Sequence, residues 1–229
     1  AGNAATTVNV VNVTFDTTTP TVTLTKSGAD LIVKDADTET ITATFNEDMT
    51  SPPTISIGAL VTTANMSGGP RIWTYAWDVP AGNDGTHTVT VDGDDVAGNA
   101  YAGSTSLVFT IDNTTPTVTL TKSGADLIVK DADTETITAT FNEDMTSPPT
   151  ISIGALVTTA NMSGGPRIWT YAWDVPAGND GTHTVTVDGD DVAGNAYAGS
   201  KSLVFTIDNT APTLSPVTIA SNNSTTTLA

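Results

Sequence analysis

The sequence predicts an all-β chain made of two β-sandwiches in tandem, and three observations support this fold class. Residues 18–104 recur without change at 114–200, so the chain repeats itself with a period of 96 residues. Within each copy, apolar residues alternate with threonine, which is typical of strands buried on one face. No segment has a helical periodicity that competes with this pattern. Each repeat is long enough for one hydrophobic core of modest size.

The predicted strands of the first repeat follow one another in chain order. Threonine fills most outward positions, where a β-branched polar residue suits a solvated pleat. Segments rich in Gly, Pro, Asn and Asp separate the strands at 51–53, 67–70 and 81–85. The inward residues are, in order, Val22 and Leu24; Ile41, Ala43 and Phe45; Ile55 and Ile57; Trp73, Tyr75, Trp77 and Val79; Val89 and Val91; and Leu107, Phe109 and Ile111. About seven strands in this length is the size of an immunoglobulin-like sandwich, so we expect seven-stranded sandwiches arranged end to end.

The period also divides the chain into four segments. AGNAATTVNVVNVTFDTTTP at the start aligns with AGNAYAGSTSLVFTIDNTTP from Ala97. We therefore expect 1–16 to be the last strand of a truncated upstream repeat, 17–112 and 113–208 to be complete repeats, and 209–229 to be the first strand of a divergent repeat. We interpret the chain as a piece of a longer array, with any export signal or anchor outside it. It has no apolar run near membrane-spanning length, so we expect no direct membrane insertion of this piece.

The composition is strongly acidic and lacks cysteine. The chain has 25 acidic and 7 basic residues, which gives a formal net charge of −18. So many carboxylates repel one another unless they are solvated or bridged by divalent cations. Nucleic acid and anionic lipid are disfavoured as partners for the same reason. Disulfides cannot supplement the core, and a metal ion is a common substitute in secreted modules.

Three motifs carry a resemblance to a known family. They are TATFNEDM from Thr42, DGTHTVTVDGDDVAGN from Asp84, and FTIDNTTPT from Phe109. Together they resemble the bacterial immunoglobulin-like repeats of large cell-surface adhesins and biofilm-associated proteins. The resemblance covers both complete repeats and both terminal segments. It implies sandwiches strung end to end at the bacterial cell surface, often stiffened by calcium at the joints between repeats.

The sandwich topology gathers acidic residues at one end of each repeat. If the strands run up and down in turn, the loops after the second, fourth and sixth strands meet where the chain arrives. Several carboxylate and amide oxygens from separate segments are what a calcium ion with six to eight oxygen ligands requires. The predicted ligands of the second repeat are Asp112, Glu143, Asp144 and Asp191, with Asn195 supporting the loop. The equivalent residues of the first repeat are Asp16, Glu47, Asp48, Asp95 and Asn99.

A weaker cation site is predicted at the opposite end of each repeat. Its candidate ligands are Asp35 and Asp37 in the first repeat, and Asp131 and Asp133 in the second. The alternative for all of these residues is an ordinary polar loop, because Asp and Asn favour turns through local hydrogen bonds.

Aromatic and histidine residues are the candidates for other functions. Trp73, Tyr75 and Trp77 share one strand face, and we expect them in the core because a small sandwich needs their area. An exposed row would instead suit the stacking of sugar rings. His87 is expected to point outward, and no Ser or Cys constellation surrounds it. The sequence therefore predicts that the chain is not an enzyme.

Two classes of function remain open. In the first, the repeats form an extracellular stalk whose neighbours are further repeats of the same chain, with calcium stiffening the joints. In the second, each repeat binds a ligand, either a surface glycan or an identical repeat on another cell, with avidity from many copies. An accessory module of a secreted polysaccharide-active enzyme is a third possibility. Burial of Trp73 and Trp77 favours the stalk, whereas their exposure favours glycan binding.

Overall fold

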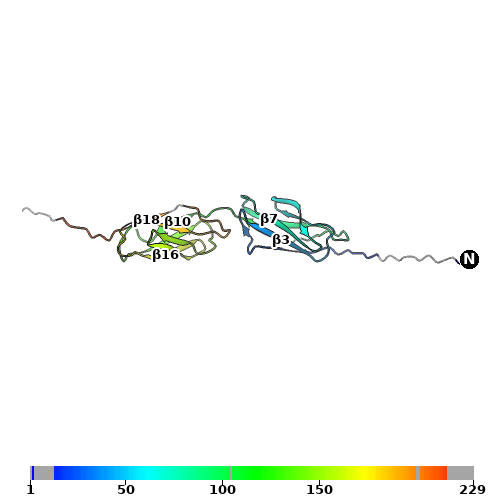
Figure 1. Cartoon of the computed structure of the whole chain (residues 1–229), viewed down its shortest axis with the longest axis horizontal. Coiled ribbons are helices and arrows are strands. Elements are labelled where there is room, and N and C mark those ends of the chain that lie inside the picture. The colour runs from blue at the N-terminus through cyan, green and yellow to red at the C-terminus, as the bar shows by residue number, and fades with distance from the viewer. Residues whose placement is uncertain (1, 3–12, 104, 200–201, 216–229) are drawn as a thin grey trace, which may run out of the picture. The chain divides into compact units, whose positions relative to one another are not determined.

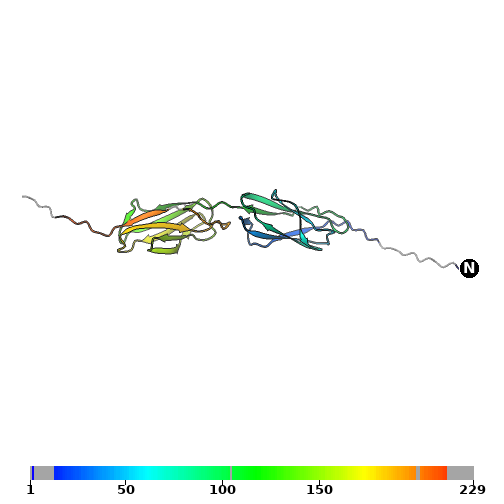
Figure 2. The same ribbon diagram turned by 45° about the horizontal axis from the view of Figure 1, so that its top comes forward.

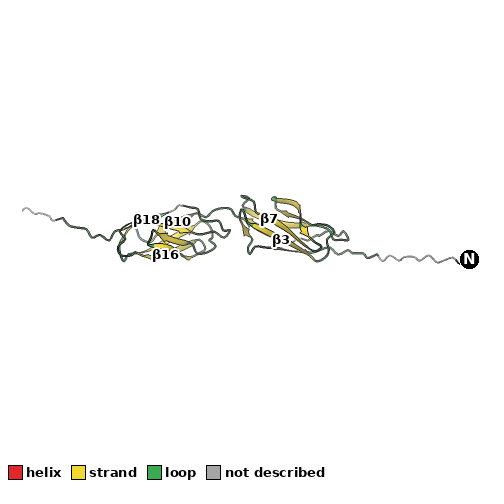
Figure 3. Cartoon of the chain, in the orientation of Figure 1, coloured by secondary structure: helices red, strands yellow, loops and turns green. Residues whose placement is uncertain are grey.

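The chain forms two compact units built from strands and loops. The computed structural model describes residue 2 and residues 13–103, 105–199 and 202–215. The first unit contains the described residues up to Pro116 together with Asp190–Tyr197, and the second contains Thr117–Gly189 and those from Ala198 onwards (Figure 1). No helix occurs in these described ranges (Figure 3), so none of their residues forms an apolar helix able to cross a bilayer.

Nine strands make up the first unit. They are β1 (Val22–Lys26), β2 (Ile32–Val33), β3 (Thr38–Phe45), β4 (Thr54–Ile57), β5 (Val61–Asn65), β6 (Ser67–Gly68), β7 (Ile72–Asp78), β8 (Gly85–Asp92) and β9 (Leu107–Ile111). One sheet has the order β1-β3-β7-β6 and the other β2-β9-β8-β4-β5. Neighbouring strands are antiparallel except β2 and β9, which are parallel.

The second unit repeats this arrangement. Its strands are β10 (Val118–Lys122), β11 (Ile128–Val129), β12 (Thr134–Phe141), β13 (Thr150–Ile153), β14 (Val157–Asn161), β15 (Ser163–Gly164), β16 (Ile168–Asp174), β17 (Gly181–Asp188) and β18 (Leu203–Ile207). Its sheets have the orders β10-β12-β16-β15 and β11-β18-β17-β13-β14. Seen from a second direction, the strands of each unit lie in two layers (Figure 2). The expected all-β sandwich fold is therefore confirmed.

The core follows from the alternation in the sequence. In β3, Ile41, Ala43 and Phe45 are buried, whereas the threonines between them face outward. Side chains from the second sheet, among them Ile55 and Phe109, close the core from the other side. Successive side chains of a strand point to opposite faces, so each sheet contributes one apolar face.

Several details differ from the expectations. Each unit has two additional strands of two residues, β2 and β6 in the first unit, too short to show any periodicity. His87 was expected to point outward, but it shares the parity of the buried Val89 and is half-buried, with Nε2 2.8 Å from the carbonyl oxygen of Asn83. Residues 13–16 and 209–215 contain no strand, and the rest of the two predicted terminal strands lies outside the described residues.

A buried ion pair lies between the neighbouring strands β1 and β3. Lys26 Nζ lies 3.7 Å from Glu39 Oε1, and both side chains are at least nine-tenths buried. Glu39 Oε2 also accepts hydrogen bonds from the Ser27 hydroxyl and the Gly28 amide. Burial opposes ionisation of Glu39, but these hydrogen bonds and the charge of Lys26 hold its pKa below the ordinary value. Lys122 and Glu135 repeat the pair at 3.5 Å in the second unit.

We predict that removing the buried cations destabilises both units. Lys26→Met together with Lys122→Met leaves each glutamate ionised in the core, so the free energy of unfolding should fall by about 3 kcal/mol or more per unit. Because both lysines are replaced together, the two units should lose the same stability, and one urea unfolding curve then measures the loss. The loss should narrow as the pH falls through the pKa of the glutamate, because protonation removes the uncompensated charge.

The matched control is Lys34→Met with Lys130→Met. The Lys34–Asp37 pair is about one-third exposed, with an Nζ–Oδ1 distance of 3.8 Å. Loss of such a pair should cost less than about 1 kcal/mol. Equal losses in the two double variants would contradict a structural role for the buried pair.

Candidate metal centre

Three acidic residues from separate segments meet at the incoming end of the first unit, where the chain arrives before β1. Asp16 precedes β1, Glu47 follows β3 and Asp95 follows β8. One carboxylate oxygen of each lies within 4.8 Å of those of the other two. The expected convergence of loops at this end is thus observed for three of the predicted ligands.

Backbone hydrogen bonds hold these segments together. The Met49 amide donates to the carbonyl oxygen of Pro70, and the Thr50 amide donates to that of Asp94, both at 3.0 Å. The Val96 amide donates to the carbonyl oxygen of Asp48 at 3.1 Å. The loops after β3, β6 and β8 are therefore tied to one another by main-chain contacts. These main-chain hydrogen bonds position the loops that carry the acidic group, and they leave its carboxylates unused.

Asn99 positions two members of the acidic group. Its backbone amide donates to Asp95 Oδ1, and its side-chain Nδ2 donates to Asp95 Oδ2, both at 2.8 Å. The same Nδ2 lies 3.2 Å from the carbonyl oxygen of Asp16. Asp95 is only 2% exposed. This burial opposes ionisation, but the donors of Asn99 and the amides of Ala97 and Gly98 hold the pKa of Asp95 below its ordinary value.

Glu47 gives the group an unsatisfied oxygen. Its Oε1 atom is buried and accepts no hydrogen bond from the residues that the structure describes. A buried carboxylate oxygen without a donor is costly, and here it lies among other carboxylates. The donor set consists only of oxygen atoms, which is the chemistry that Ca²⁺ prefers. The residues of this group therefore fit a hard divalent cation.

Asp48 has a different partner from the one expected. Its carboxylate forms an ion pair with Arg71 Nε, and Arg71 Nη1 donates to the carbonyl oxygen of Asn46 at 2.9 Å. Asp48 is not a member of the group of three. Arg71, the one arginine of its repeat, was missed as a residue of this end. In the second unit Arg167 pairs with Asp144 in the same way.

The second predicted ligand set is divided between the units. Asp112, Asp191 and Asn195 belong to the first unit, whereas Glu143 and Asp144 belong to the second. Asn195 Nδ2 donates to Asp191 Oδ2 and to the carbonyl oxygen of Asp112, both at 2.9 Å. Asn195 thus makes the contacts to Asp112 and Asp191 that Asn99 makes to Asp16 and Asp95.

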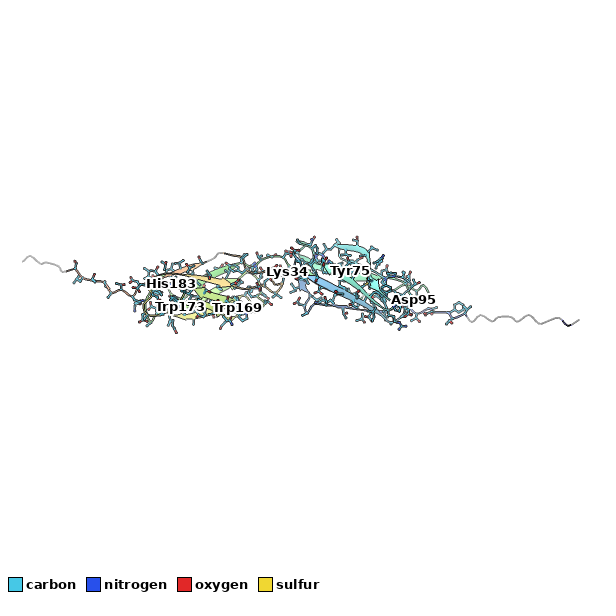
Figure 4. The ribbon with its side chains drawn as sticks, in the orientation of Figure 1. Lys34, Tyr75, Asp95, Trp169, Trp173 and His183 are labelled. Carbon is cyan, nitrogen blue, oxygen red and sulfur yellow. The ribbon has the colours of Figure 1, made fainter. Side chains whose placement is uncertain are left out.

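The residues of the weaker predicted site are engaged in a turn. Asp37 Oδ2 accepts the Lys34 amide at 2.9 Å, and the Asp35 amide donates to Asn113 Oδ1. Asp131 and Asp133 make the same contacts in the second unit. Among the described residues, none of these four aspartates belongs to a group of three metal-ligating side chains. Lys34 and Asp95 lie at opposite ends of the first unit, so this turn is remote from the acidic group (Figure 4).

The aromatic strand does not form an exposed platform. Trp73 and Trp77 are 6% and 3% exposed, and Trp77 packs at 5.1 Å from the ring centre of Phe109. Trp169 and Trp173 are buried to the same extent, inside the second unit (Figure 4). Tyr75 is partly exposed. The two tryptophans of each repeat are therefore core residues, as expected.

Comparison with known proteins gives a family for this fold. The family described as bacterial Ig-like domain (group 3) matches residues 71–166 and 167–228. Together these segments cover more than half of the chain, and their starting points lie 96 residues apart, which is the period of the repeat. No curated protein matches the sequence.

Solved structures similar to the chain are distant in sequence. The fibronectin(III)-like modules of Clostridium thermocellum CbhA are 18% identical, with a TM-score of 0.40 and coverage of 82% of this chain and 94% of that one. A Ca²⁺-stabilized adhesin of an Antarctic bacterium is 20% identical, with a TM-score of 0.49 and coverage of 85% and 50%. The Yersinia pseudotuberculosis adhesin InvE is 16% identical, with a TM-score of 0.30 and coverage of 82% and 58%. At these identities the likeness concerns the fold alone.

We predict that Asn99→Ala with Asn195→Ala destabilises the calcium-free protein. Each substitution removes a side-chain donor from a buried aspartate, which should cost about 1–3 kcal/mol per substitution in urea unfolding with chelator. Asn65→Ala with Asn161→Ala, on the exposed edge strands β5 and β14, is the control and should change stability by less than about 0.5 kcal/mol. Similar stability of both double variants would rule out this positioning role.

Proposed function

Because this chain belongs to the bacterial Ig-like domain (group 3) family, we propose that its repeats are structural stalk segments of a bacterial surface adhesin. Two nearly identical repeats suit a chain whose task is to span distance, since copy number then sets its reach. Its partners in this role are neighbouring repeats of the same chain. Calcium fastens the segments that join them. The observation that carries the proposal is the acidic group of Asp16, Glu47 and Asp95, with its unsatisfied Glu47 oxygen.

The charge of the acidic group favours a divalent cation. Three carboxylates within 4.8 Å bring three negative charges together. Arg71, whose Nη1 donates to the carbonyl oxygen of Asn46 in the loop after β3, is already paired with Asp48. A calcium ion would accept oxygens from all three carboxylates and complete its coordination with main-chain oxygens or water. The ion would act as a fastener and take no part in catalysis.

The position of Asp16 explains why such an ion would stiffen a stalk. Asp16 lies in the incoming segment, whereas Glu47 and Asp95 lie in loops of the sandwich. An ion bound by all three therefore holds the incoming segment against the body of the unit. In the second repeat the same residue types recur at Asp112, Glu143 and Asp191, so we propose a second ion there. Every incoming segment of an array is also the outgoing segment of the preceding repeat.

The proposed location is the bacterial cell surface or the extracellular space. Weak calcium sites of extracellular modules are filled at the millimolar concentrations found there. The buried tryptophans count against the alternative of a glycan-stacking platform, because Trp73 and Trp77 expose almost no ring surface.

We predict that calcium raises the melting temperature relative to chelator. Binding to the native state alone stabilises by about 2.7 kcal/mol when free calcium is 100 times the dissociation constant, which corresponds to several degrees for units of this size. Glu47→Gln with Glu143→Gln should weaken binding by about tenfold or more, since each removes a charged ligand. Calorimetric titration and thermal melts measure both effects.

Asp48→Asn with Asp144→Asn is the matched control, because these carboxylates pair with arginine. Its calcium affinity should stay within about threefold of the parent chain. Identical melts with calcium and chelator would remove the metal proposal. A larger loss of affinity in the Asp48 variant than in the Glu47 variant would mean that the ligand assignment is wrong.

We also predict that small-angle scattering of the whole chain fits an extended particle whose flexibility increases with chelator. Without the ion, the carboxylates of each incoming segment repel those of the loops. A compact scattering profile in both conditions would contradict the stalk.

A further inference from the structure

At the outgoing end of the first unit, one asparagine makes most of the side-chain contacts to the segment that leaves the unit. Asn113 follows β9, and its Nδ2 donates to the carbonyl oxygen of Gly82 at 2.8 Å and to Asp84 Oδ1 at 2.9 Å. Its backbone amide also donates to Asp84 Oδ1, at 3.0 Å. Its Oδ1 accepts the amide of Asp35 at 2.6 Å. One side chain therefore joins two separate loops of the unit to the segment that leaves it.

Thr114 and Asp84 complete this contact. The Thr114 hydroxyl donates to Asp84 Oδ2 at 3.1 Å, so both oxygens of Asp84 face the outgoing segment. The Asn113 side chain and amide, together with Thr114, stabilise the ionised carboxylate and lower the pKa of Asp84, although slight desolvation acts in the opposite direction. Asp84 belongs to no group of metal-ligating side chains among the described residues. Three hydrogen bonds from Asn113 and Thr114 reach its two carboxylate oxygens.

The same contacts recur in the second unit, where the sequence of these segments is repeated. Asn209 Nδ2 donates to the carbonyl oxygen of Gly178 at 2.7 Å and to Asp180 Oδ1 at 3.0 Å, and its amide donates to Asp180 Oδ1 at 2.9 Å. The Thr210 hydroxyl donates to Asp180 Oδ2 at 2.8 Å. Here too the hydrogen bonds lower the pKa of the aspartate, Asp180.

We propose that Asn113 and Asn209 are positioning residues that fix the direction of the outgoing segment without a metal ion. We call the contacts of Asn113 with Asp35, Gly82 and Asp84, and those of Asn209 in the second unit, the asparagine latch. The biological role of this latch rests on the proposed stalk function, but its hydrogen bonds do not require calcium. Each joining segment would then be held by two different means. Asparagine ties it to the preceding repeat through hydrogen bonds, and the adjacent aspartate, Asp112 in the first linker, offers a charge to the cation of the following repeat.

The latch needs an asparagine because it uses both a donor and an acceptor at one side-chain end. Nδ2 must donate to two oxygens, while Oδ1 must accept an amide. Aspartate has the same shape but no donor, and it would place a second carboxylate against Asp84. Asn113→Asp is therefore an isosteric substitution that replaces the hydrogen bond to Asp84 with repulsion between two carboxylates. Asn113→Ala removes the contact without adding charge.

Hydrogen exchange of the Asn113 amide, which donates to Asp84 Oδ1, tests the proposal on the whole chain. Peptides across this segment differ in mass from those across Asn209, because Thr115 corresponds to Ala211. The unchanged segment of the second unit thus serves as an internal control. In the parent chain the Asn113 amide should be protected to the same extent with calcium and with chelator. In Asn113→Asp and Asn113→Ala, exchange should accelerate about tenfold or more, while the Asn209 segment stays protected.

Thr115→Ala gives the first segment the sequence of the second and should leave exchange unchanged. Protection that disappears with chelator in the parent chain would overturn the proposal, and so would unaltered protection in both Asn113 variants. Glu47→Gln with Glu143→Gln separates the latch from the calcium proposal. Exchange at Asn113 should not respond to this change, even where the calcium-dependent melting shift is lost.

Discussion

The alternation of inward apolar side chains with outward side chains, most of them threonine, is the constraint on which the rest of the structure depends. Without disulfides, a unit of this size is stable only if both sheets bury a continuous apolar face. Alternation leaves little room for charge on the strands, so most acidic residues lie in the loops at the two ends. Glu39 is the acidic strand residue that is buried in the first unit, and it is accommodated by Lys26, Ser27 and Gly28. The placement of negative charge is thus a consequence of how the core is made.

The two ends of a unit accommodate this charge differently. At the outgoing end, Asp84 receives amide and hydroxyl donors from Asn113 and Thr114. At the incoming end, Asn99 satisfies Asp95, but Glu47 retains a buried oxygen without a donor. A polar cluster that is only partly satisfied by its own chain is suited to an external ligand, whereas a satisfied one is suited to a fixed structural role. The two ends therefore differ in how far hydrogen bonds satisfy their carboxylates, and this difference does not depend on the number of carboxylates.

The repeat, the sandwich and the buried tryptophans could be predicted because periodicity records which residues face inward. The convergence of Asp16, Glu47 and Asp95 could be predicted from topology, since alternate loops of a sandwich meet at one end. The partner of Asp48 could not be predicted, because it depends on the direction in which the Arg71 side chain points. The turn at Asp37 depends on local hydrogen bonds that compete with metal binding. His87 could have been placed correctly, since it lies two residues from the buried Val89.

The parallel pairing of β2 with β9 has a mechanical consequence. β9 leads directly into the outgoing segment, whereas β2 follows β1, which begins at the incoming end. Tension between the two ends therefore pulls these neighbouring strands in opposite directions along their length. The pairing is short, with Ile32 opposite Thr110 and Val33 opposite Ile111, but backbone hydrogen bonds of 2.8 and 2.9 Å extend it on either side. Hydrogen bonds between two strands that are pulled in opposite directions share the force and must break together. When two strands are instead pulled apart from one end, their hydrogen bonds break one after another.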